Sequence, residues 1–131
     1  MRVVVWTAGL LAVMGLITGC SSKCEAVCSE ANACVVGERA TDVDCPHFCA
    51  DAESFDKRLT DAGNESCAAK FEAHLDCWEK NTQQICNKEF VDCKEPAQEW
   101  VACMTPYCAA LKAENKTDPN CTNGKPSLVP F

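Results

Sequence analysis

The chain has 131 residues, including 13 cysteines, and 19 acidic residues outnumber 12 basic ones to give a formal net charge of −7 at pH 7. A surface with this excess of negative charge repels nucleic acid, so the composition argues against a nucleic-acid partner. Cysteine at this density in a short chain is typical of a disulfide scaffold in an oxidising compartment, which argues against a cytosolic protein.

The first 19 residues have the layout of an export signal. Arg2 provides a basic start, an apolar stretch covers residues 3–17, and the small residue Gly19 stands at the expected cleavage point. A transmembrane span needs about 20 apolar residues, and this stretch is shorter. We therefore expect residues 1–19 to be a cleaved signal peptide.

The sequence at the predicted cleavage point, Ile17-Thr18-Gly19-Cys20, resembles the lipobox of bacterial lipoproteins. The resemblance implies that the sulfur of Cys20 carries a diacylglycerol, that the signal is removed before this cysteine, and that acyl chains on Cys20 bind the membrane. It also implies a place in the bacterial cell envelope at the outer membrane, because Ser21 stands where inner-membrane lipoproteins often have Asp. Residues 20–23 are then the lipid attachment point and a short tether.

The number of cysteines supplies an independent argument. With Cys20 set aside, twelve thiols are left, and an even number can pair completely. If the protein is secreted without lipidation and Cys20 forms an ordinary disulfide, one of the thirteen cysteines has no partner. Parity therefore favours lipidation over the alternative of a soluble secreted cysteine-rich protein.

Two helices are expected in the first half of the mature chain. Ser22 to Glu25 fits a capping box that opens a helix over about 23–35, with Gly37 as its stop. A second helix is expected from Asp44-Cys45-Pro46 to Gly63. Each helix has two cysteines at i,i+4 spacing, which places both thiols on one face. In an antiparallel hairpin the outer pair and the inner pair meet, which predicts the disulfides Cys24–Cys49 and Cys28–Cys45.

The second half repeats this pattern with wider spacing. Cys67 and Cys77 lie on a helix expected to start near Asn64 or Ser66, and Cys93 and Cys103 lie on one expected to start within 92–96. This twin Cx9C arrangement over residues 64–105 resembles the coiled-coil-helix-coiled-coil-helix (CHCH) hairpin. The resemblance implies the disulfides Cys67–Cys103 and Cys77–Cys93, although the extra Cys86 departs from the family pattern.

Four cysteines are left without an assigned partner, and their pairing stays open because four thiols allow three connectivities. They are Cys34, Cys86, Cys108 and Cys121. Pro106 is expected to break or kink the chain after Met104, with a further short helix over 108–112. We expect one cysteine-rich helical domain over residues 24–121 and a flexible tail over 122–131.

The predicted fold is all-α, with two disulfide-stapled antiparallel helical hairpins in one small domain. The cysteine pattern of nearly the whole mature chain is also similar to that of cysteine-rich helical lipoproteins of myxobacteria. That similarity brings no activity with it.

Sites for chemistry are sparse in the sequence. No Cys-x-x-Cys redox motif is present, and His47 and His74 stand too far apart for a zinc finger, so both are expected to be partly exposed. No nucleophile motif or phosphate-binding glycine loop occurs. Trp78 and Trp100 are expected in the core, with a carbohydrate or partner platform as the alternative. The acidic side chains along the second helix are expected on its solvent face: Asp51, Glu53, Asp56 and Asp61.

These observations predict a lipoprotein that is not an enzyme, with no cofactor and no metal. Its expected role is structural or one of interaction or binding at the cell envelope, with the membrane and an unidentified envelope protein or ligand as partners. A thiol-disulfide or metal-handling envelope protein is the alternative from another functional class.

Overall fold

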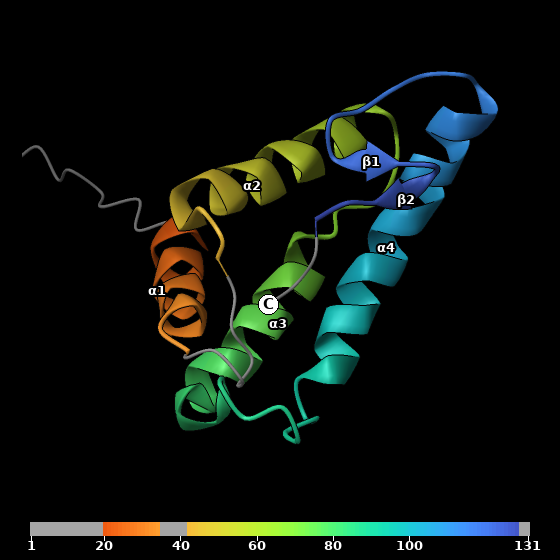
Figure 1. Cartoon of the computed structure of the whole chain (residues 1–131). Helices are drawn as coiled ribbons and strands as arrows, with labels where there is room; N and C mark the ends of the chain where they lie inside the picture. The colour runs from red at the N-terminus through yellow and green to blue at the C-terminus, as the bar shows by residue number, and fades with distance from the viewer. Residues whose placement is uncertain (1–19, 35–41, 129–131) are drawn as a thin grey trace, which may run out of the picture.

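The computed structural model describes residues 20–34 and 42–128, and the side chains from Lys23 onward. The described chain is mostly helical, with one small β-hairpin (Figure 1). Six disulfides cross-link it. Its elements are α1 (Cys20–Asn32), α2 (Cys45–Asp61), α3 (Ala68–Lys80), the 3-10 helix η1 (Thr82–Gln84), α4 (Lys94–Ala113), β1 (Cys121–Thr122) and β2 (Lys125–Pro126). The predicted signal peptide and the helix stop at Gly37 lie outside the described residues.

The local signals around α2 are confirmed. Asp44 is the N-cap and its carboxylate accepts a hydrogen bond of 3.1 Å from the His47 amide, while Pro46 occupies the first turn. The other end closes at Gly63, whose φ of +85° suits a residue without a side chain. The Gly63 amide donates to the Thr60 carbonyl at 2.9 Å. Asp44 and Pro46 at the start and Gly63 at the end therefore mark both boundaries of this helix in the sequence.

Helices α1 and α3 begin elsewhere than the sequence predicts, whereas α4 begins at Lys94, within the expected 92–96. Because α1 already begins at Cys20, Ser22 lies inside it instead of capping it, and the predicted short tether over 20–23 is helical. The N-cap of α3 is Cys67, and that of α4 is Cys93. Neither cysteine makes a side-chain cap bond, but the Ser66 hydroxyl accepts a hydrogen bond of 3.2 Å from the Ala68 amide at the start of α3.

The expected break at Pro106 is wrong, because α4 continues without interruption from Lys94 to Ala113. Pro106 lies on the exposed side of the helix, where water can reach the carbonyl that loses its partner. The opposite side buries Trp100, Met104 and Tyr107. Packing of this apolar stripe outweighs the local cost of proline, so residues 108–112 are the end of α4 and not a separate helix.

Aromatic side chains from three helices form the centre of the core. Phe71 of α3 and Trp100 of α4 have ring centroids 4.5 Å apart, and Phe48 of α2 lies 6.3 Å from each. Phe55 meets Tyr107 edge to face at 5.4 Å. Trp78 and Trp100 are each only 2% exposed, which confirms their expected place in the core and removes both as a surface platform.

The C-terminal segment departs from the expected flexible tail over 122–131. Cys121 pairs with Pro126 and Thr122 with Lys125 in an antiparallel hairpin. Its turn is Asn123-Gly124, with φ of 54° and 79°, as a two-residue hairpin turn requires. Leu128 is buried at 6% exposure, so residues 121–128 belong to the folded domain, and residues 129–131 lie outside the described part.

Candidate functional site

The N-terminal end of α1 is braced immediately after the predicted lipid attachment residue. Three residues beyond Cys20, the Lys23 ammonium contacts Glu72, lies 2.6 Å from Asp76 and lies 3.8 Å from Glu79, all on α3. Hydrogen bonds to Asp76 and Glu72 raise the pKa of Lys23, and the hydrogen bond from Lys23 lowers the pKa of Asp76. An ion cluster thus holds the first turn of α1 against α3.

Two disulfides hold the same helix against α2. The structure joins Cys24 to Cys49 and Cys28 to Cys45, with Cα–Cα distances of 5.9 and 5.7 Å. These are the pairs expected from the i,i+4 spacing. Because the crosslinks begin four residues after Cys20, a lipid on that residue would be linked to the folded head through about one turn of helix.

The structure pairs all twelve cysteines from residue 24 to residue 121. The pairs Cys67–Cys103 and Cys77–Cys93, implied by the twin Cx9C resemblance, are joined at Cα–Cα distances of 5.8 and 5.6 Å. The four unassigned cysteines form the two disulfides Cys34–Cys86 and Cys108–Cys121. All six Cα–Cα distances lie within the ordinary range for disulfides.

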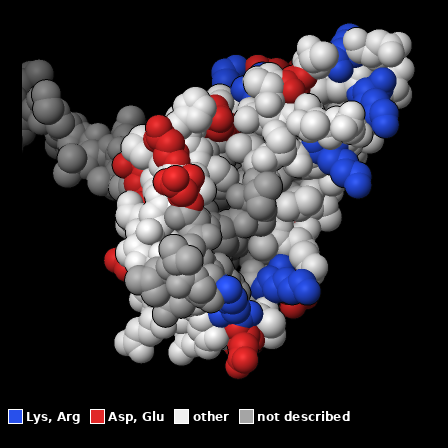
Figure 2. All heavy atoms as spheres, viewed as in Figure 1, with Lys and Arg blue, Asp and Glu red and all other residues white. Residues whose placement is uncertain are grey.

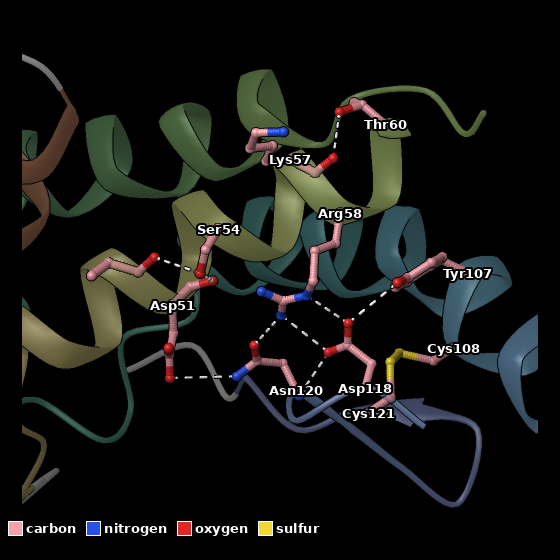
Figure 3. A network of polar contacts seen from close by, with 11 residues as sticks. Asp51, Ser54, Lys57, Arg58, Thr60, Tyr107, Cys108, Asp118, Asn120 and Cys121 are labelled. Carbon is pink, nitrogen blue, oxygen red and sulfur yellow. Dashed lines mark hydrogen bonds and ion pairs between the residues drawn. A yellow bond between two sulfur atoms is a disulfide. The ribbon is translucent and has the colours of Figure 1, made fainter. Parts of the chain in front are cut away.

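A buried polar network ties the C-terminal segment to α2 (Figure 3). The guanidinium of Arg58 donates to both carboxylate oxygens of Asp118, at 2.6 and 3.1 Å, and to the side-chain oxygen of Asn120 at 2.5 Å. Tyr107 of α4 donates its hydroxyl to Asp118 at 3.2 Å, and the Asn120 side chain reaches Asp51 at 3.4 Å. The network therefore connects α2, α4 and the segment that enters β1.

The carboxylate of Asp118 is buried, and its charge is stabilised by the hydrogen bonds of this network. Its side chain is 3% exposed, and burial alone would raise its pKa. The hydrogen bonds from Arg58, from the Asn120 amide and from Tyr107 outweigh burial and lower the pKa of Asp118 below its ordinary value. In return, the hydrogen bond to Asp118 raises the pKa of Arg58. A carboxylate bonded in this way holds the C-terminal segment against α2 and α4.

No protein-family model, curated protein or solved structure matches this chain. None of the helices within residues 20–34 and 42–128 is long and apolar enough to cross a membrane.

The two histidines lie in different environments, and the expectation of partial exposure is wrong for His74. His47 is exposed on α2, with its Nε2 3.3 Å from Asp51. His74 of α3 is 0% exposed and stacks on Trp100, with an interplanar angle of 15° and centroids 6.2 Å apart. Burial lowers the pKa of His74 to about 4. It is a neutral core side chain, because its position on α3 faces α4 instead of solvent.

The described part of the chain contains no group of three or more Cys, His, Asp or Glu side chains placed to hold a metal ion.

The acidic residues of α2, which were all expected on its solvent face, differ in exposure. Glu53 and Asp61 are exposed, whereas Asp51 and Asp56 are partly buried. Asp56 accepts a hydrogen bond of 2.5 Å from the Cys67 amide, and thereby orients the start of α3.

The sequence offered no signal for the Lys23 cluster or the Arg58 network. Lys23 and Asp76 are 53 residues apart, and Arg58 and Asp118 are 60 residues apart. Helical spacing relates only residues three or four apart on one helix. A complementary pair at such a separation is recognisable only once the helices have been packed.

Proposed function

We propose that this protein is an exported lipoprotein, anchored through acyl chains on Cys20 to the bacterial outer membrane, with a disulfide-braced helical head. The head serves a structural, interaction or binding role at the cell envelope. Residues 1–19 are the signal peptide in this proposal. The lipobox-like Ile17-Thr18-Gly19-Cys20 is the recognition sequence for lipidation.

One observation carries the proposal: the twelve cysteines of residues 24–121 pair with one another, so Cys20 is the thirteenth and has no cysteine partner left. A single leftover thiol in an exported protein is normally modified, paired between molecules or reactive. Its place at the end of the lipobox-like sequence favours modification by lipid.

The covalent layout supports a mechanical role for the head. We propose that α1 with α2, and α3 with α4, form two antiparallel hairpins. In each pair the outer cysteine joins the outer one and the inner joins the inner one, which suits helices that run in opposite directions. Disulfides contribute about 2–4 kcal/mol each by restricting the unfolded chain, so such a head resists unfolding.

Intact-mass measurement of protein extracted from membranes tests the proposal. The full chain is expressed in a Gram-negative host, and the mature protein is weighed before and after reduction. We expect a polypeptide that begins at Cys20 and carries added acyl mass, and a gain on reduction of two hydrogens for each of six disulfides. Free thiols or bound metal would favour a thiol-disulfide or metal-handling protein instead.

A pair of variants isolates the anchor. Cys20→Ser should lose the acyl mass and leave the membrane fraction, whereas the matched control Ser21→Ala should stay in it. Retention of Cys20→Ser in the membrane, or release of the unmodified wild type as a soluble protein, would overturn the proposal. Ser21→Asp tests the sorting step, and we expect it to shift the protein toward the inner membrane.

A further inference from the structure

A hollow lies at the end of the molecule formed by the last turn of α4 and the β-hairpin. Its volume is about 340 Å³, within the range of small-ligand sites. Leu111 and the Cys108–Cys121 disulfide provide apolar lining, and the charged lining residues are Lys112, Lys116 and Asp118. Its polar neutral lining comes from Asn115, Thr117 and Asn123.

The walls of this hollow are fixed before any ligand arrives. Asn115 has a φ of 54°, and the Lys116 amide bonds the Leu111 carbonyl at 2.8 Å, which closes the end of α4 in a tight capping turn. The Cys108–Cys121 disulfide joins α4 to β1, and the buried Asp118 is held by Arg58. A preorganised site loses little conformational freedom on binding.

This end of the molecule has a net positive charge, opposite in sign to the charge of the whole chain. Residues 108–128 contain three lysines and two acids, although the full chain has a net charge of −7. Figure 2 shows basic side chains gathered over this end of the molecule. Asp118 is neutralised by Arg58, and Glu114 lies 2.7 Å from Lys116 in an exposed pair of small energetic value. Within residues 20–34 and 42–128, Lys112 has no acidic partner.

We propose that this hollow binds a small soluble oxyanion, a phosphate or carboxylate group, through Lys112 and Lys116. Lys112 packs across the hairpin, since a Cβ placed on Gly124 would come within 2.8 Å of its Cδ. Its ammonium is therefore attached to a fixed stem beside the hollow. Neutral amide and hydroxyl groups of the lining can donate further hydrogen bonds to the anion. The site does not depend on acylation of Cys20, so its failure would leave the anchoring proposal untouched.

A lipid headgroup is the other source of the same chemistry, and the position of the hollow disfavours it. Figure 1 places α1 at one side of the molecule and the C-terminal end of α4 at the opposite side. The chain enters the described fold at Cys20, on α1. A hollow at the far end faces solvent when that residue lies at a bilayer.

Titration of the full mature protein with inorganic phosphate and with succinate, followed by amide NMR, tests the proposal. We expect saturable shifts confined to residues 108–125. Lys112→Gln should weaken binding about threefold to fivefold, the range of a partly exposed ion pair. Glu114→Gln, which frees Lys116, should strengthen it by about the same factor. Lys88→Gln, an exposed lysine outside the hollow, is the matched control and should bind as the wild type does.

Each alternative outcome is decisive. Absence of saturable shifts with both probes would overturn the proposal, as would shifts that Lys112→Gln and Glu114→Gln leave unchanged. A third arm adds phosphatidylglycerol vesicles to the Cys20→Ser variant. Vesicle binding through residues 108–125, without binding of either soluble probe, would assign the site to a lipid headgroup and reject the soluble ligand. Retained binding by Lys116→Gln together with Lys112→Gln would also reject it.

Discussion

Lowering the pH from 8 to 5 should destabilise the protein through His74. This side chain is 0% exposed and stacked on Trp100, and burial lowers its pKa from the ordinary 6.5 to about 4. The unfolded chain therefore binds a proton at a higher pH than the folded chain does. The stability that comes from neutral His74 is complete above pH 6.5 and is lost as the pH falls toward 4.

The magnitude follows from the two pKa values. Each pKa unit corresponds to about 1.4 kcal/mol, so the full effect is about 3 kcal/mol, reached only below pH 4. At pH 5 the unfolded chain is almost fully protonated and the folded chain is not, so we expect a loss of about 2 kcal/mol relative to pH 8. Asp76 and Asp118 have lowered pKa values and lose their contributions only below their ordinary value of 3.8, outside this window.

Urea unfolding without reductant at several pH values between 8 and 5 measures this loss. His74→Leu removes the titrating group but keeps an apolar side chain, so its stability should be nearly independent of pH in this window. His47→Gln removes the exposed histidine and should retain the wild-type slope. The reasoning is refuted if the wild type shows no slope, or if His74→Leu shows the same slope as the wild type.

Three further variants test other parts of the fold by the same unfolding measurement. Arg58→Met leaves the charge of Asp118 buried without its partner and should lower the free energy of unfolding by about 2–3 kcal/mol. The control Lys57→Met, at the exposed neighbouring residue, should lower it by less than about 0.5 kcal/mol. Pro106→Ala restores a backbone donor on the exposed side of α4 and should stabilise by about 1 kcal/mol. Replacing Cys34 and Cys86 together by Ala removes a crosslink between residues 52 apart and should cost about 2–4 kcal/mol.

Each of these expectations has a contrary result. Equal effects of Arg58→Met and Lys57→Met would mean that the buried pair contributes no more than a surface pair. Destabilisation by Pro106→Ala would mean that proline is preferred at this position in α4. A change below about 0.5 kcal/mol on removing Cys34 and Cys86 would mean that this crosslink does not restrict the unfolded chain appreciably.

The features that the sequence predicted correctly depend on neighbours along the chain. Asp44 and Pro46 start α2, Gly63 ends it, and cysteines four residues apart share a helix face. Each thiol pair lies on one face of its helix, and the disulfides between α1 and α2 are the expected Cys24–Cys49 and Cys28–Cys45. The places of Trp78 and Trp100 in the core follow in the same way from helical spacing.

The features that the sequence missed depend on partners distant along the chain. Pro106 reads locally as a break, but the packing of Trp100 and Met104 keeps α4 continuous. The sequence predicts His74 to be partly exposed, but the packing of α4 against α3 buries it.

By itself, the sequence determined an acidic helical chain with four cysteine-bearing segments and a lipobox-like start. Only the tertiary structure decided the disulfides Cys34–Cys86 and Cys108–Cys121, the Arg58–Asp118 pair and the hairpin that closes the domain. The physical reason is the range of the interactions. Caps, turns and helix faces are set by residues within about four positions, whereas burial and long-range pairing depend on which surfaces the packed helices bring together.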